Sequence, residues 1–303
     1  MGRSAVRVMC VTQHPDGVGT ILVAACSRLV LMCWHITWIE DGTRIRAHVL
    51  AQRGLPSTPH SARGGAYADD ADDADARYLC VTAWTHGDHS VYVACGSSDA
   101  QLSIWALTTT GQNCTWKLVD TAHCSRMQLS VARLQQRSGE MLLAFGSTDG
   151  DVTIWACSGA DDQEVNPALA VRLRRMATLQ RVHQSGVNAL RACCGSSAEG
   201  SPCTWIITGG DDGAVCVLAL VFTPPVGLRV IAAVRCPASH SSSVKCVVLH
   251  GGTTFATVSM DQRVCLWCVR FATWQSPQEA DTFVLYSGDS HGKHRSSPPI
   301  RHH

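Results

Sequence analysis

A chain of 303 residues is long enough for one large all-β domain or for two ordinary domains, so its length does not fix the number of domains. Its 25 lysines and arginines balance 24 aspartates and glutamates, and a net charge of +1 excludes the basic surface of a protein that grips nucleic acid by itself. A DNA partner is not expected, and any RNA contact is expected to be local or shared with a partner.

The N-terminus has no secretory apolar core, and the longest apolar run, residues 214–222, is far shorter than the roughly 20 residues that cross a bilayer. Sixteen cysteines fall largely within apolar strands such as Val91–Cys95. That placement favours buried thiols in a reducing compartment over a disulfide scaffold. We therefore expect a soluble cytoplasmic protein without membrane contact.

The first unit of the chain is predicted to occupy residues 1–50 and to consist of strands, because polar and apolar residues alternate with a period of two. The expected strands lie near Val6–Thr12, Thr20–Cys26, Leu29–Trp34 and Arg44–Leu50. Residues 51–76 follow, rich in glycine, proline and serine, with an acidic stretch at 69–75. Because this composition buries little apolar surface, it predicts a mobile surface insertion.

Four further units are predicted within residues 77–269, starting near Arg77, Ser125, Gly186 and Ser243. Each unit shows a strand, a short break, a second strand ending in small residues, a tight turn and a third strand. Residues 270–303 form a divergent tail that is expected to be disordered, with one candidate strand at Thr282–Tyr286.

One spacing recurs in these units: an aspartate, five residues, then a large apolar residue that closes the third strand. The copies are Asp99 to Trp105, Asp149 to Trp155, Asp212 to Leu218 and Asp261 to Trp267. A fifth copy, ending at Trp34, has Arg28 in place of the aspartate. Self-similarity at this range indicates a repeat architecture, and such arrays usually hold partners rather than transform substrates.

The turn aspartate, the closing tryptophan and an upstream histidine resemble the markers of WD-repeat β-propellers. His123, His183 and His240 each precede by four positions an apolar residue that opens a unit. The resemblance implies an all-β WD-repeat β-propeller of about five divergent blades, incomplete or the C-terminal part of a longer one. Such a set of blades would leave sheet edges or packing faces uncovered.

The resemblance also implies buried structural hydrogen-bond sets that join histidine, strand hydroxyl, turn aspartate and tryptophan. The best match is His240, Thr257, Asp261 and Trp267. A second set, His183, Thr208 and Asp212, lacks the indole because Leu218 takes its place, and a third keeps His123, Asp149 and Trp155 with Phe145 at the hydroxyl position. No serine nucleophile sits at an elbow motif, so no catalytic residue is assigned.

Other clusters fit simpler interpretations. Cys265 and Cys268 are three apart on a strand and point to opposite faces, which disfavours a shared metal. The sequence has no glycine-rich turn between a strand and a helix, the motif that cradles nucleotide-like cofactors, so no cofactor is expected. The basic cluster Arg172, Arg174, Arg175 and Arg181 fits either an ordinary solvated outer strand or a stripe that meets RNA phosphates.

The segments 182–190 and 259–267, with Asp211–Gly213 between them, resemble the closing repeats of the WD repeat-containing protein 6 family. That family is the non-catalytic subunit of a tRNA ribose 2′-O-methyltransferase. The resemblance implies a scaffold that binds the methyltransferase catalytic subunit and helps present tRNA for methylation at the wobble region. The alternative is a general protein-interaction propeller in trafficking, ubiquitination or chromatin assembly.

Overall fold

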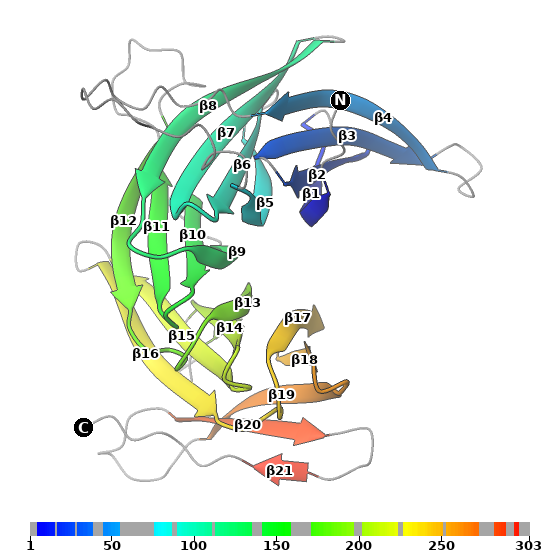
Figure 1. Cartoon of the computed structure of the whole chain (residues 1–303). Coiled ribbons are helices and arrows are strands. Elements are labelled where there is room, and N and C mark those ends of the chain that lie inside the picture. The colour runs from blue at the N-terminus through cyan, green and yellow to red at the C-terminus, as the bar shows by residue number, and fades with distance from the viewer. Residues whose placement is uncertain are drawn as a thin grey trace, which may run out of the picture. The chain divides into compact units, whose positions relative to one another are not determined.

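The structure is a computed structural model, and its described residues form strands joined by turns (Figure 1). It describes residues 5–296 except residues 16, 28, 39–44, 55–75, 87–89, 111–112, 135–140, 159–170, 197–201, 224–226, 251–252, 273–281 and 289–293. In this part of the chain every element is a strand, and there is no helix long and apolar enough to cross a membrane.

The strands form five antiparallel sheets, called blades one to five in chain order. Blade one contains β1 (Val6–Gln13), β2 (Thr20–Cys26), β3 (Val30–Trp38) and β4 (Ile45–Gly54), and blade two contains β5 (Tyr78–His86), β6 (Ser90–Ser97), β7 (Gln101–Thr110) and β8 (Asn113–His123). Blade three contains β9 (Gln128–Leu134), β10 (Met141–Ser147), β11 (Val152–Ser158) and β12 (Arg172–Leu179).

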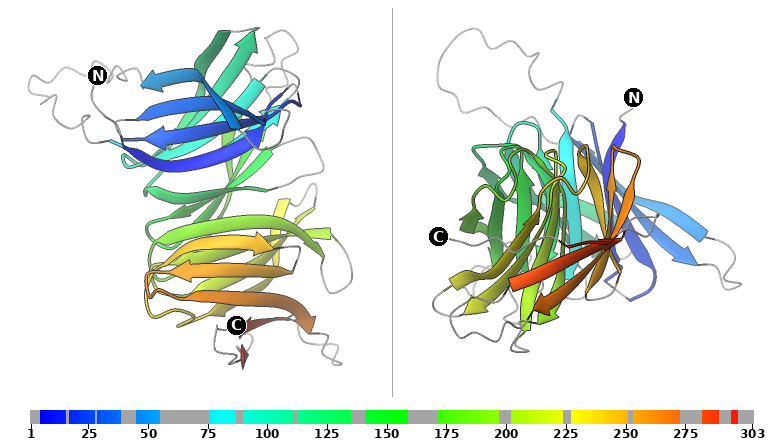
Figure 2. Two further views of the ribbon diagram at one scale, coloured as in Figure 1. Left: turned by 90° about the vertical axis from the view of Figure 1, so that its right-hand side faces the viewer. Right: turned by 90° about the horizontal axis from the view of Figure 1, so that it is seen from below.

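Blade four contains β13 (Val187–Ser196), β14 (Pro202–Gly210), β15 (Val215–Thr223) and β16 (Gly227–Cys236). Blade five has five strands, which are β17 (Val244–His250), β18 (Thr254–Ser259), β19 (Val264–Ala272), β20 (Thr282–Gly288) and β21 (His294–Ser296). Within each blade, every strand pairs with the next one along the chain, and Figure 2 shows the strands of a blade lying side by side. Sequential antiparallel pairing is the arrangement that short turns allow.

The chain divides into two compact units, residues 1–128 with 159–173, and residues 129–158 with 174–303. In the first unit, blades one and two share an apolar core that includes Val23, Leu31, Tyr78, Val93 and Trp105. In the second unit, one core joins blades three and four and another joins blades four and five. Burial of these blade faces is the main stabilising term of the fold.

Burial along a strand follows from how many neighbours its blade has. In blade four, every residue of β14 from Cys203 to Gly210 is buried, because blade three packs on one face of the sheet and blade five on the other. In blade five, β18 alternates between buried and more exposed residues. Successive side chains of a strand point to opposite faces, so a strand covered on one face buries every second residue, and this alternation in burial is the pattern observed.

The structure changes two of the expected boundaries. The last strand of blade one, β4, runs to Gly54 and so takes four residues of the expected insertion, while residues 55–75, including the acidic stretch, lie outside the described residues. In the expected tail, β20 pairs with β19 and β21 pairs with β20. Ser287, Gly288 and His294–Ser296 thus belong to strands, because backbone pairing does not require apolar side chains, and disorder of the tail stays a prediction.

Candidate functional site

The repeated aspartates all lie in the tight turn between the second and third strands of a blade. The residue after each one has a left-handed backbone, with φ of 61° at Ala100, 90° at Gly150, 69° at Gly213 and 63° at Gln262. The carboxylates of Asp212 and Asp261 accept the backbone N–H two residues on, at 3.1 and 3.0 Å. Each of these two aspartates therefore closes its own turn, as short polar side chains commonly do.

In blade five the side chain of His240 links the turn aspartate to the sheet. The Nδ1 atom lies 3.2 and 3.1 Å from the two oxygens of Asp261, and Nε2 lies 2.8 Å from the hydroxyl of Thr257. The indole N–H of Trp267 donates to the same hydroxyl at 2.8 Å. Because a carboxylate only accepts, we assign a proton to Nδ1, and the Thr257 hydroxyl then donates to Nε2. The four residues form one connected chain of donors and acceptors.

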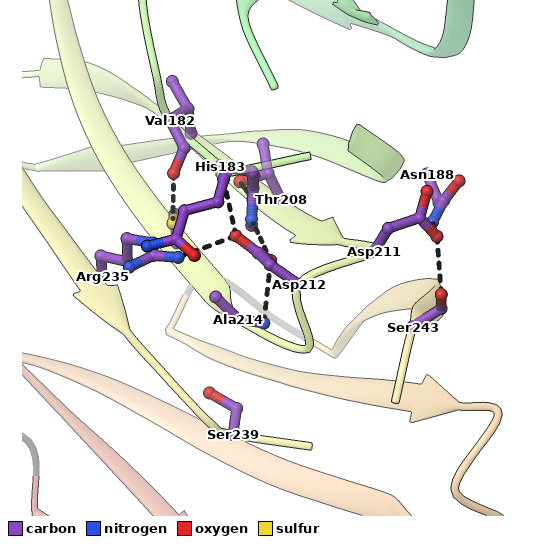
Figure 3. Close-up of polar contacts among 12 residues, drawn as sticks. Val182, His183, Asn188, Thr208, Asp211, Asp212, Ala214, Arg235, Ser239 and Ser243 are labelled. Carbon is purple, nitrogen blue, oxygen red and sulfur yellow. Dashed lines mark hydrogen bonds and ion pairs between the residues drawn. The ribbon is translucent and has the colours of Figure 1, made fainter. Parts of the chain in front are cut away.

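In blade four His183 lies between Asp212 and Thr208 in the same way (Figure 3). Its Nδ1 is 2.9 Å from Asp212 Oδ1 and its Nε2 is 2.8 Å from the Thr208 hydroxyl. The position of the missing indole is filled by Leu218, which packs in the core between blades three and four. In place of the indole hydrogen bond, blade four has an ion pair: Arg235 Nη2 donates to Asp212 Oδ2 at 2.7 Å.

Sequence reasoning missed Arg235, and no spacing pointed to it. It lies on β16, the fourth strand of blade four, 23 residues after the aspartate that it contacts. Only the hairpin pairing of β15 with β16, in which Arg235 lies opposite Cys216, brings its side chain to the turn. A buried carboxylate needs donors, and this arginine supplies a charged one.

The environment of these groups shifts their pKa values in a consistent direction. Burial alone raises the pKa of Asp212, but hydrogen bonds from Gln184 N–H, Arg235, His183 and Ala214 N–H outweigh it and hold the pKa well below its usual range. Burial lowers the pKa of His183, against the opposing pull of Asp212. Near neutral pH the aspartate is ionised and the imidazole is neutral, so the pair forms a fixed hydrogen bond.

Asp261 behaves similarly. Burial raises the pKa of its carboxyl, but the backbone N–H groups of Ser241 and Arg263, together with His240, lower it by more. In both blades every nitrogen of the histidine and the carboxylate that it faces are already engaged within the chain. Groups whose hydrogen-bonding atoms are all engaged in this way hold the loop against the turn, and no side chain in either set is placed to act as a nucleophile.

The third expected set does not form as predicted. His123 is the last residue of β8, is exposed, and places Nδ1 3.2 Å from the Ala100 carbonyl in the first unit. The backbone N–H of His183 donates to the carbonyl of the turn residue Gly150, and that of His240 donates to the carbonyl of Gly213. In this repeat the carbonyl of the turn residue Ala100 accepts instead from the backbone N–H of Cys124. Cys124 therefore holds the histidine position of this repeat.

The discrepancy lies in the residue that opens blade three. An apolar residue such as Met127 is the expected opener, but β9 begins at Gln128, four positions after Cys124. The same interval separates His183 from Val187 and His240 from Val244. Gln128 is buried although it is polar, and its amide NH2 donates to the Arg126 carbonyl at 2.8 Å.

The other members of the third set make local contacts in blade three. Asp149 accepts a hydrogen bond from the Ser147 hydroxyl, and the same hydroxyl also lies 3.0 Å from the Asp151 carbonyl. The indole of Trp155 donates to Thr153 Oγ1 at 3.0 Å. Serine and threonine on neighbouring positions thus supply contacts of the kind that histidine and threonine supply in blades four and five.

A polar cluster that the sequence did not indicate lies beside Asp212. The neighbouring Asp211 accepts hydrogen bonds from Asn188, from the Ser243 hydroxyl at 2.6 Å and from Lys245 Nζ at 3.1 Å. Figure 3 shows Asn188 and Ser243 beside Asp211. Burial raises the pKa of Asp211, but these three donors lower it by more. The cluster joins blade four to blade five through side chains that are partly exposed.

The basic cluster lies along β12 and the turn that follows it. Arg172, Arg174 and Arg175 are exposed, and Arg172 Nη1 lies 3.7 Å from Asp120 within the first unit. Arg181 is also exposed and donates its backbone N–H to Asp151 at 2.7 Å. Among the described residues, no three histidine, cysteine, aspartate or glutamate side chains are grouped to hold a metal ion.

Comparison with known proteins agrees with this geometry. No protein-family model matches the chain. A chain in the structure of a humanized mutant of the Chaetomium thermophilum Polycomb Repressive Complex 2 bound to the inhibitor GSK343 superposes with a TM-score of 0.57 at 12% identity, covering 91% of this chain and 57% of that chain. At this identity the match shows the fold alone. The blades, their turn aspartates and the histidine sets define the chain as a WD-repeat β-propeller.

At the level of sequence, the chain is similar to tRNA (34-2'-O)-methyltransferase regulator WDR6 of Pongo abelii and of Homo sapiens. Each is 24% identical over 220 residues, which cover 64% of this chain and 19% of the relative. The chain thus spans about a fifth of the length of the curated relatives that it matches.

Proposed function

We propose that this chain is a non-catalytic WD-repeat scaffold that acts in the cytoplasm, binds the catalytic subunit of a tRNA ribose 2′-O-methyltransferase and helps present tRNA for methylation at the wobble region. The observation that carries the proposal is the similarity to relatives named as regulators of a tRNA (34-2'-O)-methyltransferase. The fold supports a scaffold, because propellers of this class offer loops and blade edges to partners.

The chemistry of the repeated turns is consistent with that role. The imidazole of His183 is neutral and engaged at both nitrogens, and the Asp212 carboxylate is saturated by donors from its own chain. Groups fixed in this way stabilise loops and do not exchange protons with a substrate. The catalytic groups are therefore assigned to the partner.

The binding experiment uses the full chain and a tRNA ribose methyltransferase catalytic subunit. We expect the two to co-purify, and we expect 2′-O-methylation at position 34 of tRNA to be faster with the chain than with the catalytic subunit alone. Failure to bind this subunit, together with recovery of coat, ligase or chromatin components from cell extract without tRNA, would reject the proposal and favour the general interaction propeller.

Direct contact with tRNA is assigned to the exposed arginines of β12. Replacing Arg172 and Arg174 with alanine is expected to weaken tRNA binding and to lower the slope of log K against log salt by about one for each phosphate that the protein no longer neutralises. Arg229→Ala is the matched control, since this exposed arginine lies on β16, the fourth strand of blade four. An equal slope for the double variant and the control would remove tRNA contact from β12.

A further inference from the structure

The polar cluster beside the turn of blade four leaves one carboxylate oxygen without a donor. The cluster, called here the Asp211 cluster, consists of Asp211, Asn188, Ser243 and Lys245, which all lie in the second unit of the chain. The three donors reach the same atom, Asp211 Oδ1. The other oxygen, Oδ2, accepts no hydrogen bond from any residue that the structure describes. A carboxylate oxygen accepts about two donors, so Oδ2 is open to a donor from outside the chain.

Asn188 carries a second acceptor oxygen of this kind. Because a carboxylate only accepts, the Asn188 amide turns its NH2 group toward Asp211. The amide oxygen of Asn188 is then left with no donor within the described part of the chain. The two side chains are hydrogen-bonded to each other, and the Asp211 side chain is 40% exposed, so both open oxygens lie close together at the surface. A single cation with several N–H groups can reach both.

Two β-bulges place the side chains of the cluster. The register of β13 with β14 shifts just before Ala189, and the register of β17 with β18 shifts just before Cys246. Asn188 and Lys245 are therefore the extra residues of two bulges, and a bulge re-aims a side chain that a regular ladder would hold in another direction. Both side chains reach Asp211, one from its own blade and one from the next.

The turn itself does not require a carboxylate at this position. The residue directly before the turn aspartate is different in the other blades with this aspartate: Ser98, Thr148 and Met260. The backbone contact is nevertheless the same, since Asp211 N–H donates to the Gly186 carbonyl at 2.8 Å and Met260 N–H donates to the Ser243 carbonyl at 3.0 Å. The charge on Asp211 is thus a property of blade four and not of the repeat.

The surroundings of Oδ2 suit a guanidinium group. A Cβ added at Gly186 would lie 2.9 Å from Asp211 Oδ2 and 2.8 Å from Leu129 Cδ1, so the open oxygen lies beside an apolar side chain of blade three. The guanidinium of arginine is planar, weakly hydrated and rich in N–H donors, and it can pack on an apolar side chain while it donates to an oxygen. The ammonium of lysine is compact and strongly hydrated, which suits this position less.

We propose that the Asp211 cluster binds the arginine side chain of a partner protein. Asp211 Oδ2 and the amide oxygen of Asn188 accept the guanidinium N–H groups, and Leu129 packs against the arginine side chain. Lys245 opposes this binding, because its ammonium lies 3.1 Å from Asp211 Oδ1 and repels a second cation. The site is independent of the methyltransferase and of tRNA.

Titration of the full chain with N-acetylarginine methylamide, followed by nuclear magnetic resonance, tests the site. We expect a saturable shift of the Gly186 amide signal, and no such shift with the citrulline analogue, which has the same shape without the charge. Asp211→Asn should weaken binding about tenfold, because it removes a charge-assisted hydrogen bond. Lys245→Gln should strengthen binding about fivefold, because it removes the competing cation. A cluster that only joins blade four to blade five predicts neither change.

Asp151→Asn is the matched control, since Asp151 is a partly exposed aspartate in the corresponding turn of blade three and accepts the Arg181 backbone N–H. This variant should bind the arginine probe as the wild type does. A wild-type chain without a saturable shift overturns the proposal, and so does a Lys245→Gln variant that binds more weakly or a lysine analogue that binds as tightly as the arginine probe. If circular dichroism shows that Asp211→Asn is unfolded, Asn188→Ala, which removes the second acceptor, takes its place and should also bind more weakly.

Discussion

Replacing Asp212 with alanine removes a carboxylate whose side chain is only 7% exposed. Its partners are His183, the Arg235 guanidinium and the backbone N–H groups of Gln184 and Ala214. The variant leaves the arginine without its buried counter-charge and several donors without an acceptor. Loss of one partner of a buried charged pair costs about 3–5 kcal/mol, and we expect a loss of unfolding free energy in that range.

The neighbouring residue offers a matched control. The side chain of Asp211 is 40% exposed, and its ion pair with Lys245 is solvated, so Asp211→Ala is expected to cost about 1 kcal/mol. In urea unfolding followed by circular dichroism, an m-value of about 2 kcal/mol/M puts the midpoint of Asp212→Ala about 2 M below that of the wild type. Asp212→Asn keeps the shape of the side chain but not its charge, and its urea midpoint should lie between those of Asp212→Ala and the wild type. Equal midpoints for the two alanine variants would refute the role assigned to this carboxylate.

Two further predictions concern pH and backbone strain. The pKa of His183 lies below its ordinary value of 6.5 and the pKa of Asp212 lies below 3.8, so the folded state binds fewer protons than the unfolded state. Stability should therefore decline as pH falls through about 6.5 and again below about 4. His183→Gln should flatten the first of these declines, measured as urea midpoints from pH 7.5 to 5. An unchanged decline would contradict the assignment of this decline to His183. Ala100→Gly should raise the melting temperature, since relieving an alanine of its left-handed backbone is worth about 1 kcal/mol. Gly213→Ala should lower the melting temperature, because a Cβ at this position would lie 2.4 Å from the His240 carbonyl oxygen. Changes of the same sign in both variants would argue against turn strain.

The period-two pattern and the aspartate spacing predicted the all-β class and the five blades, and the structure confirms both. The structure also brings His183 and His240 to the turn aspartates expected from the spacing. These features depend on short intervals within a repeat, because a tight turn and the loop that covers it are set by a few residues around them. Local chemistry of this kind can be inferred without knowing how blades pack.

Sequence is a less reliable guide where an apolar residue is taken as the start of a strand. His123 is expected in a buried set because it precedes Met127 by four positions, but the strand opens at the buried polar residue Gln128. Similarly, the polar composition after Ser287 does not indicate β21, which pairs with β20 through its backbone. In both cases hydrogen bonding, which composition does not reveal, decides the boundary.

What the sequence determined by itself is the repeat, with its strands, turns and the residues that pin them, since alternation and turn chemistry are local properties. What only the tertiary structure decided is which apolar faces are buried. Val215 and Val264 are the same residue at the same repeat position, yet one is 0% and the other 53% exposed. Val215 is buried because blade five covers its face of blade four, and burial of this kind is a property of the packed pair of blades and not of the strand.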